Sequence, residues 1–166
     1  MLSGLWSRNL RMRSHQKERS ILFNEEDPMQ RGNLLHRAME EIHHPDDIAP
    51  VIDRMQANGE INGQQAATWK GNIAKLLNDP VLAPYFAKGA KVKTEAALMD
   101  QDGRFYRPDR VVFLEQETAI IDYKSGKAQS SHQQQMEAYA DILQQMGYPA
   151  VKKLIVYLDE VTTKTV

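Results

Sequence analysis

The hydrophobic pattern of the chain changes character near residue 88. Before this point, apolar residues recur every three or four positions, as they do on the buried face of an amphipathic helix. Leu35, Met39 and Ile42 follow this spacing in the first such segment, which Asp27 can cap and Pro45 ends. The pattern predicts helices over residues 28–43, 46–57 and 62–77, and a short helix over 81–87.

After residue 88 the chain has the pattern of strands. Two extended, apolar-rich runs are joined by Asp-Gln-Asp-Gly at 100–103, which is a hairpin signal. Ala119-Ile120-Ile121 indicates a strand buried on both faces. The pattern predicts strands over 91–99, 104–114, 118–124 and 151–158, with a helix from residue 130 or 131 to 147 before the last strand. The fold class is therefore α/β, with a helical segment followed by a small mixed sheet in β-β-β-α-β order.

Composition narrows the class of protein. A chain of 166 residues, 42% hydrophobic and 26% charged, fits a single domain with its own core. Its apolar runs fall far short of the roughly 18 residues that a membrane span needs. The first 13 residues lack the continuous apolar stretch of a secretory signal, so we expect a cytoplasmic protein without a membrane partner. The absence of cysteine excludes disulfides, thiolate zinc sites, a cysteine nucleophile and a cysteine-held iron–sulfur cluster.

Charge does not by itself indicate a polyanion partner, because the net charge is −1. Residues 1–20 nevertheless carry five basic residues and one acidic residue. This segment is either a basic arm that touches nucleic acid or a solvated leader or interdomain linker. We expect 1–20 to stand apart from a single domain over 21–166.

Asp109, Asp122 and Lys124 form the most informative combination of charged residues. Asp122 and Lys124 are two apart on a predicted strand, so their side chains share one face of the sheet. A hairpin turning at 116–117 would place Asp109 opposite Lys124, with Asp122 as its diagonal neighbour. Carboxylate oxygens are natural ligands of Mg²⁺ or Mn²⁺, and a nearby lysine can orient water and steady a phosphate. Alternatively, the three residues are an ordinary exposed pair at a strand end and a turn residue.

Four motifs occur in a fixed order along the chain. They are Gly32-Asn33-Leu34-Leu35-His36, Arg107-Pro108-Asp109-Arg110, Asp122-Tyr123-Lys124-Ser125-Gly126 and Gln135-Met136-Glu137-Ala138-Tyr139. Together they resemble the RecB-like nucleases of the PD-(D/E)XK superfamily, and the resemblance covers residues 30–158. It implies a restriction-endonuclease-like core and the metal-dependent hydrolysis of DNA phosphodiester bonds, with Mg²⁺ or Mn²⁺ as cofactor.

The resemblance also implies roles for individual residues. It assigns metal binding to the side chains of His36, Asp109 and Asp122 and to the backbone carbonyl of Tyr123. Asp109, Asp122 and Lys124 are the implied catalytic residues, and Lys124 would activate the water. Further candidates for supporting the site or binding DNA are Glu95, Gln135, Tyr139, Arg107 and Arg110.

The implied partners are DNA and a helicase. The chain has no phosphate-binding G-x-x-x-x-G-K-[ST] loop, so a helicase motor would come from another domain or subunit. The resemblance favours an exonuclease over an endonuclease, in a helicase–nuclease of DNA repair or recombination. The alternative is a non-catalytic DNA-binding or helicase-docking module that retains the nuclease fold.

The remaining histidines are weaker candidates. His43, His44, Asp46 and Asp47 could suggest a metal site, but Pro45 breaks the geometry. A helix end followed by an aspartate cap explains this cluster better. His132 is the next histidine to consider as a ligand if His36 is not one.

Overall fold

The structure is a computed structural model that describes residues 27–148 and 151–166. The predicted leader over 1–20 lies outside the described residues. The first half is helical, as predicted, and the Asp27 side chain caps its first helix by accepting a hydrogen bond from the Met29 backbone N–H. The helices are α2 (Pro28–Glu41), α3 (Ile48–Ala57) and α4 (Gly63–Leu77), and the 3₁₀ turns are η1 (Pro45–Asp47) and η2 (Ala83–Phe86). In the part of the chain that is described, no helix is both long and apolar enough to span a bilayer.

The second half contains the strands and one further helix. Helix α5 (Ser130–Gln145) lies where the sequence predicts it. The strands are β1 (Lys91–Thr94), β2 (Leu98–Met99), β3 (Phe105–Tyr106), β4 (Arg110–Phe113), β5 (Thr118–Lys124), β6 (Val151–Tyr157) and β7 (Thr162–Thr165). The fold is therefore α/β with a mixed sheet, as expected, and β7 is an additional edge strand that the sequence analysis did not predict.

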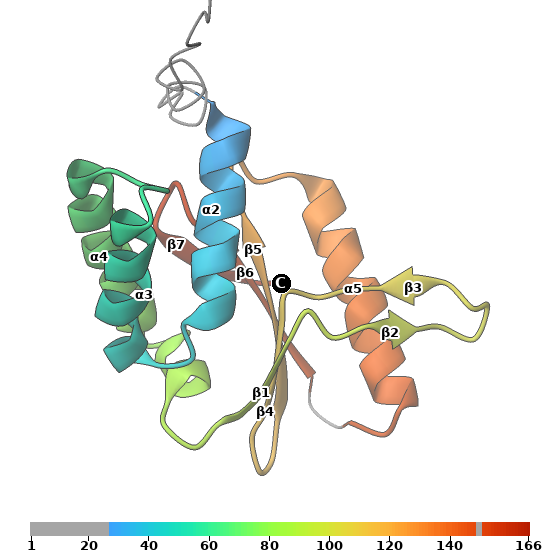
Figure 1. The fold of residues 1–166 in the computed structure, drawn as a ribbon. Coiled ribbons are helices and arrows are strands. Elements are labelled where there is room, and N and C mark those ends of the chain that lie inside the picture. The colour runs from blue at the N-terminus through green and yellow to red at the C-terminus, as the bar shows by residue number, and fades with distance from the viewer. Residues whose placement is uncertain (1–26, 149–150) are drawn as a thin grey trace, which may run out of the picture.

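A five-stranded sheet in the order β1-β4-β5-β6-β7 forms the centre of the domain. Strands β5 and β6 are parallel, and α5 makes the crossover between them, whereas the other neighbours are antiparallel. Helices α2, α3 and α4 cover one face of the sheet and α5 covers the other (Figure 1). Strands β2 and β3 form a separate small hairpin that extends from the domain over α5 (Figure 1).

The alternation of side chains along the strands divides the core into two parts. Ile121 and Tyr123 of β5 pack toward α2, α3 and α4, whereas Ile120 packs against Met136 and Leu143 of α5. The first six residues of β5 are all buried, because helices cover both faces of this central strand. This confirms the prediction from Ala119-Ile120-Ile121.

Two details of the strands differ from the predictions. The predicted strands over 91–99 and 104–114 are each interrupted, at Glu95, whose φ is +48°, and near Pro108, so each gives two short strands. The turn between β4 and β5 closes with the Leu114 N–H donating to the Glu117 carbonyl, one residue earlier than predicted. The pairing of β4 with β5 is therefore shifted by two residues. Asp109 lies level with Asp122, directly beyond the Arg110–Ile121 pair, instead of opposite Lys124.

Candidate active site

The two aspartates meet where β4 begins and β5 ends. Asp109 follows the buried Pro108, and its backbone carbonyl accepts a hydrogen bond from the Glu95 N–H at 2.9 Å. Its carboxylate Oδ2 accepts a hydrogen bond from the Tyr123 N–H at 2.7 Å. Asp122 lies on β5 and is only 2% exposed. The shift of two residues keeps both side chains on the same face, because side chains alternate with a period of two. The prediction that the carboxylates are neighbours is therefore confirmed, although the pairing that produces it differs.

Lys124 joins the aspartates to helix α5. Its Nζ lies 2.5 Å from Asp122 Oδ2 and donates a hydrogen bond to Gln135 Oε1 at 2.9 Å. Gln135 Nε2 donates to the Tyr139 hydroxyl at 2.6 Å, which in turn lies 3.5 Å from the Arg107 carbonyl. Gln135 and Tyr139 are one helical turn apart and face the site together. The structure thus brings three of the four motifs into one chain of polar contacts.

Helix α2 brings His36 to the edge of the same site. The His36 Nδ1 lies 3.8 Å from Asp109 Oδ2, and its ring meets the Tyr123 ring edge-on with 6.1 Å between centroids. The approach of α2 depends on Gly32, because a Cβ there would lie 2.7 Å from Ser125 Oγ. The small residue therefore makes room for the loop after β5, so that His36 reaches the aspartates.

The site concentrates negative charge that its own residues do not fully balance. Burial and the charge of Asp122 raise the pKa of the Asp109 carboxyl to about 7. Burial lowers the pKa of the His36 imidazole, so this side chain tends to be neutral; Asp122 opposes the shift and Lys124 adds to it. Burial raises the pKa of Tyr139 to about 12, which keeps its hydroxyl protonated and able to donate.

The carboxylates fit a divalent cation. Asp122 Oδ2 is buried and, despite its close ion pair with Lys124, has no hydrogen-bond partner among the described residues. Two carboxylates side by side, one of them buried, form the oxygen-rich donor set that Mg²⁺ and Mn²⁺ prefer. However, across residues 27–148 and 151–166, no group of three or more His, Cys, Asp or Glu side chains is arranged to hold a metal ion. His36 therefore lies near the aspartates without completing a three-side-chain site with them.

Two glutamates, Glu95 and Glu40, lie beside the two aspartates. Glu95 directly follows β1 and lies next to Asp109, and its carboxylate is 3.3 Å from an Arg107 guanidinium nitrogen. Glu40 of α2 lies close to the Glu95 carboxylate. Burial and this neighbouring carboxylate raise the pKa of Glu40. Glu40 was not among the residues predicted from the sequence. The available signal was its position one helical turn after His36, which places both side chains on one face of α2.

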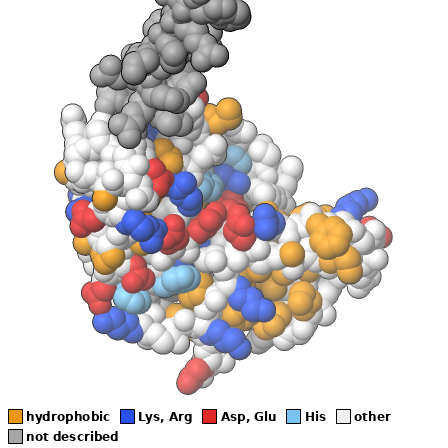
Figure 2. All heavy atoms as spheres, in the orientation of Figure 1, with side chains coloured by type: hydrophobic (Ala, Val, Ile, Leu, Met, Phe, Trp, Pro, Cys, Tyr) orange, Lys and Arg blue, Asp and Glu red, His pale blue; other side chains and the backbone are white. Residues whose placement is uncertain are grey.

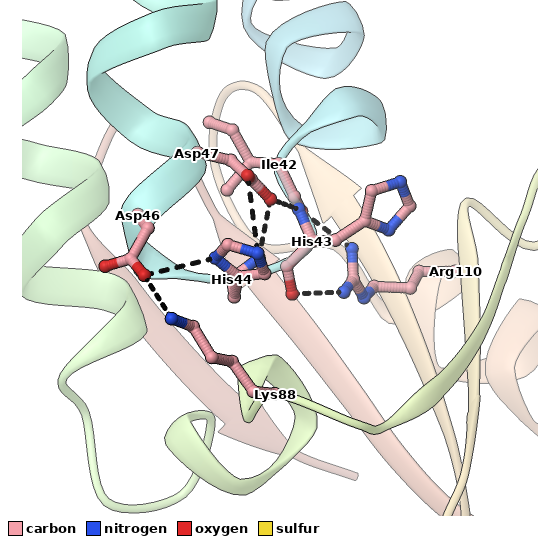
Figure 3. Close-up of polar contacts among 7 residues, drawn as sticks. All are labelled: Ile42, His43, His44, Asp46, Asp47, Lys88 and Arg110. Carbon is pink, nitrogen blue, oxygen red and sulfur yellow. Dashed lines mark hydrogen bonds and ion pairs between the residues drawn. The ribbon is translucent and has the colours of Figure 1, made fainter.

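Arg110, predicted to support the site or bind DNA, does not lie with the other site residues. Its side chain is fully buried on the opposite face of the sheet, where the guanidinium donates to the Ile42 carbonyl at 2.9 Å and the His43 carbonyl at 3.2 Å (Figure 3). The guanidinium carbon also lies 4.0 Å from the centroid of the Phe86 ring. Arg110 therefore satisfies the carbonyl of Ile42, the C-cap of α2, and that of the next residue, neither of which has a helical hydrogen-bond partner.

The cluster after α2 is a helix-end structure, as the sequence favoured. Asp47 Oδ2 accepts hydrogen bonds from the backbone N–H groups of His43 and His44, at 2.9 and 3.0 Å (Figure 3). Asp46 instead pairs with the Lys88 ammonium group at 2.6 Å. His132 is the other histidine considered as a ligand. It lies at the start of α5, and its Nδ1 is 3.3 Å from the hydroxyl of Tyr157 on β6.

Comparison with known families agrees with this arrangement. A family model described as the PD-(D/E)XK nuclease superfamily matches residues 6–165. No curated protein matches the chain.

Proposed function

The chain belongs to the PD-(D/E)XK nuclease superfamily, and on this basis we propose that it is a divalent-metal-dependent deoxyribonuclease. One observation carries the proposal: Asp109, Asp122 and Lys124 converge at one end of the sheet, where the buried Asp122 carboxylate pairs with the Lys124 ammonium group. A purely structural role does not need two adjacent carboxylates, because clustering like charges destabilises the fold.

The carboxylates would hold the metal ion. Asp109, Asp122 and the Tyr123 backbone carbonyl are the proposed ligands, with the His36 imidazole as a further ligand at the rim. When bound, Mg²⁺ or Mn²⁺ supplies Lewis-acid stabilisation of the negative charge that develops on phosphate oxygens during hydrolysis.

Lys124 would act on the water and the phosphate. Its Nζ is oriented by Asp122 on one side and Gln135 on the other. An ammonium group fixed in this way can orient the attacking water and donate a hydrogen bond to a phosphate oxygen. Gln135 and Tyr139 would keep Lys124 in position, because their hydrogen bonds connect it to α5 and to the Arg107 carbonyl.

We further propose that the protein is a RecB-like exonuclease of DNA repair or recombination that works with a helicase domain or subunit. The contact of Gln135 with Lys124 supports the RecB-like assignment, because it gives the Gln135-x-x-x-Tyr139 motif a direct role beside the lysine. Glu95 and Arg107 would border the DNA path next to Asp109.

Cleavage by the purified chain is the test. End-labelled linear DNA and circular single-stranded DNA are incubated with Mg²⁺, with Mn²⁺ or with EDTA. We expect metal-dependent release of short products from the linear DNA and little cleavage of the circle. Asp122→Asn should abolish cleavage, whereas the exposed Asp141→Asn on α5 is a matched control that should retain it.

Two outcomes would contradict the proposal. DNA binding without cleavage under any metal condition would indicate the non-catalytic alternative. Equal activity of Asp122→Asn and the Asp141→Asn control would show that the cleavage comes from elsewhere.

A further inference from the structure

The hairpin of β2 and β3 exposes an unusual pair of large hydrophobic side chains. We call residues 96–107 the arm. Met99 and Phe105 are cross-strand partners on the arm and are 58% and 76% exposed. Phe105 is the most exposed large hydrophobic side chain in the described part of the chain. A paired aromatic and thioether facing water contributes little to folding, so a contact with another molecule is the better explanation.

The arm is held firmly in spite of its small size. Leu98 and Tyr106, on the face opposite Met99 and Phe105, pack against α5, where the Tyr106 ring meets the Tyr139 ring edge-on at 6.1 Å. At the turn, Asp100 Oδ1 accepts hydrogen bonds from two backbone N–H groups, and its Oδ2 accepts one from the Tyr106 hydroxyl at 3.1 Å. A two-stranded hairpin is only marginally stable alone, so these contacts fix the surface that it presents.

The arm is also fixed relative to the active site. It leaves the sheet after Glu95 and returns at Asp109, the two residues joined by a backbone hydrogen bond. Tyr139 contacts the Arg107 carbonyl at the base of the arm and Gln135, which holds Lys124. A strand with a phosphate at Lys124 would therefore have neighbouring nucleotides within reach of the arm.

Basic residues lie on the arm and on the strand that leads into it. In the described ranges, Lys91, Lys93 and Arg104 form no ion pair with a carboxylate. Figure 2 shows hydrophobic and basic side chains next to one another on this face, beside the acidic side chains of the site. Aromatic surface combined with basic side chains suits a ligand that has both flat bases and phosphates.

We propose that Met99 and Phe105 form a stacking platform for unpaired bases of the strand whose phosphate occupies the active site. The inference rests on the proposed nuclease function and specifies its substrate as single-stranded DNA or a frayed end. In a duplex, the faces of internal bases are already stacked, so the platform would discriminate against fully paired DNA.

Binding without cleavage tests the platform. Fluorescence anisotropy in EDTA compares a short oligothymidylate with a blunt, GC-clamped duplex, for the wild type and three variants. Phe105→Ala should weaken oligothymidylate binding about 5- to 150-fold, the range found for loss of a base–aromatic stack. Phe105→Leu keeps apolar surface but loses the aromatic face, so it should lose most of the same affinity. Val81→Ala, at a residue that is 47% exposed and distant in sequence, is the matched control and should bind normally.

Separate measurements distinguish the failure of this inference from the failure of the nuclease proposal. Cleavage in Mn²⁺ tests the nuclease, while anisotropy in EDTA tests the platform whether or not cleavage occurs. Three results would overturn the platform. Phe105→Ala could bind oligothymidylate as tightly as the wild type does, or the wild type could fail to bind oligothymidylate at all. Phe105→Ala could also lose as much affinity for the duplex as for oligothymidylate. A change in sedimentation of Phe105→Ala with unaltered DNA affinity would also overturn it, and would assign the surface to protein association.

Discussion

Replacing Arg110 with methionine should destabilise the domain by about 3 kcal/mol without changing the DNA affinity of the folded protein. Each hydrogen bond from the charged guanidinium to the Ile42 and His43 carbonyls contributes roughly 1.5–3 kcal/mol. The contact with the Phe86 ring contributes about 2 kcal/mol more in a desolvated site. Methionine keeps part of the apolar packing and removes the cost of burying a charge, which is several kcal/mol, so the net loss is smaller than the sum.

Urea unfolding followed by circular dichroism measures this loss, and anisotropy with labelled DNA measures binding below the unfolding transition. Arg54→Met is the matched control, because Arg54 pairs with Glu41 in an exposed ion pair and should change stability by less than about 1 kcal/mol. A loss below about 0.5 kcal/mol in Arg110→Met would refute the capping role, since that is the range of ordinary surface substitutions. A loss of DNA affinity at unchanged stability would restore the original DNA-binding prediction.

Three further predictions concern the charged site. In EDTA, Asp109→Asn should gain stability over the wild type as pH rises from 5 to 7, by up to about 2.7 kcal/mol. Because the pKa of Asp109 is raised in the native protein, the native wild type holds a proton that the unfolded chain has already lost. Rising pH therefore destabilises the wild type but not the variant. Urea unfolding at several pH values checks this, and parallel curves for the two proteins would contradict it. Lys124→Ala should retain Mn²⁺ binding in calorimetry but lose cleavage at least about 100-fold, as expected for a group acting on water and phosphate; activity within a few-fold of wild type would show that Lys124 is only a surface charge. His36→Ala should weaken Mn²⁺ binding more than Mg²⁺ binding, because imidazole nitrogen favours Mn²⁺; equal losses for the two metals would argue against direct ligation.

The sequence was most informative where local chemistry determines structure. The Asp27 cap, the doubly buried β5 and the Asp122–Lys124 pair could all be predicted, because capping geometry and side-chain alternation depend on neighbouring residues. The pairing of Asp109 was harder to predict. A shift of two residues leaves every side chain on its own face, so the hydrophobic pattern does not distinguish the two registers.

Arg110 and Glu40 show where the sequence was misread or insufficient. Adjacent residues on a strand face opposite sides, so an Asp109 in the site requires Arg110 to face away from it. The sequence places Glu40 one helical turn after His36, but its approach to Glu95 depends on the position of α2 against the sheet, which no local pattern determines.

The hairpin of β4 and β5 has a consequence for the kinetics of folding. Its ends are close in sequence, and such hairpins close within about 1–10 μs, whereas the parallel pairing of β5 with β6 must wait for the α5 crossover. Of these two pairings, the one that can close first is therefore the one that forces Asp109 and Asp122 together. This is local frustration at the start of folding, since the hydrophobic pairing favours closure and the two like charges oppose it. Protonation of one carboxylate, or a cation between them, would speed this step, so the charges proposed to serve catalysis also set an early folding rate.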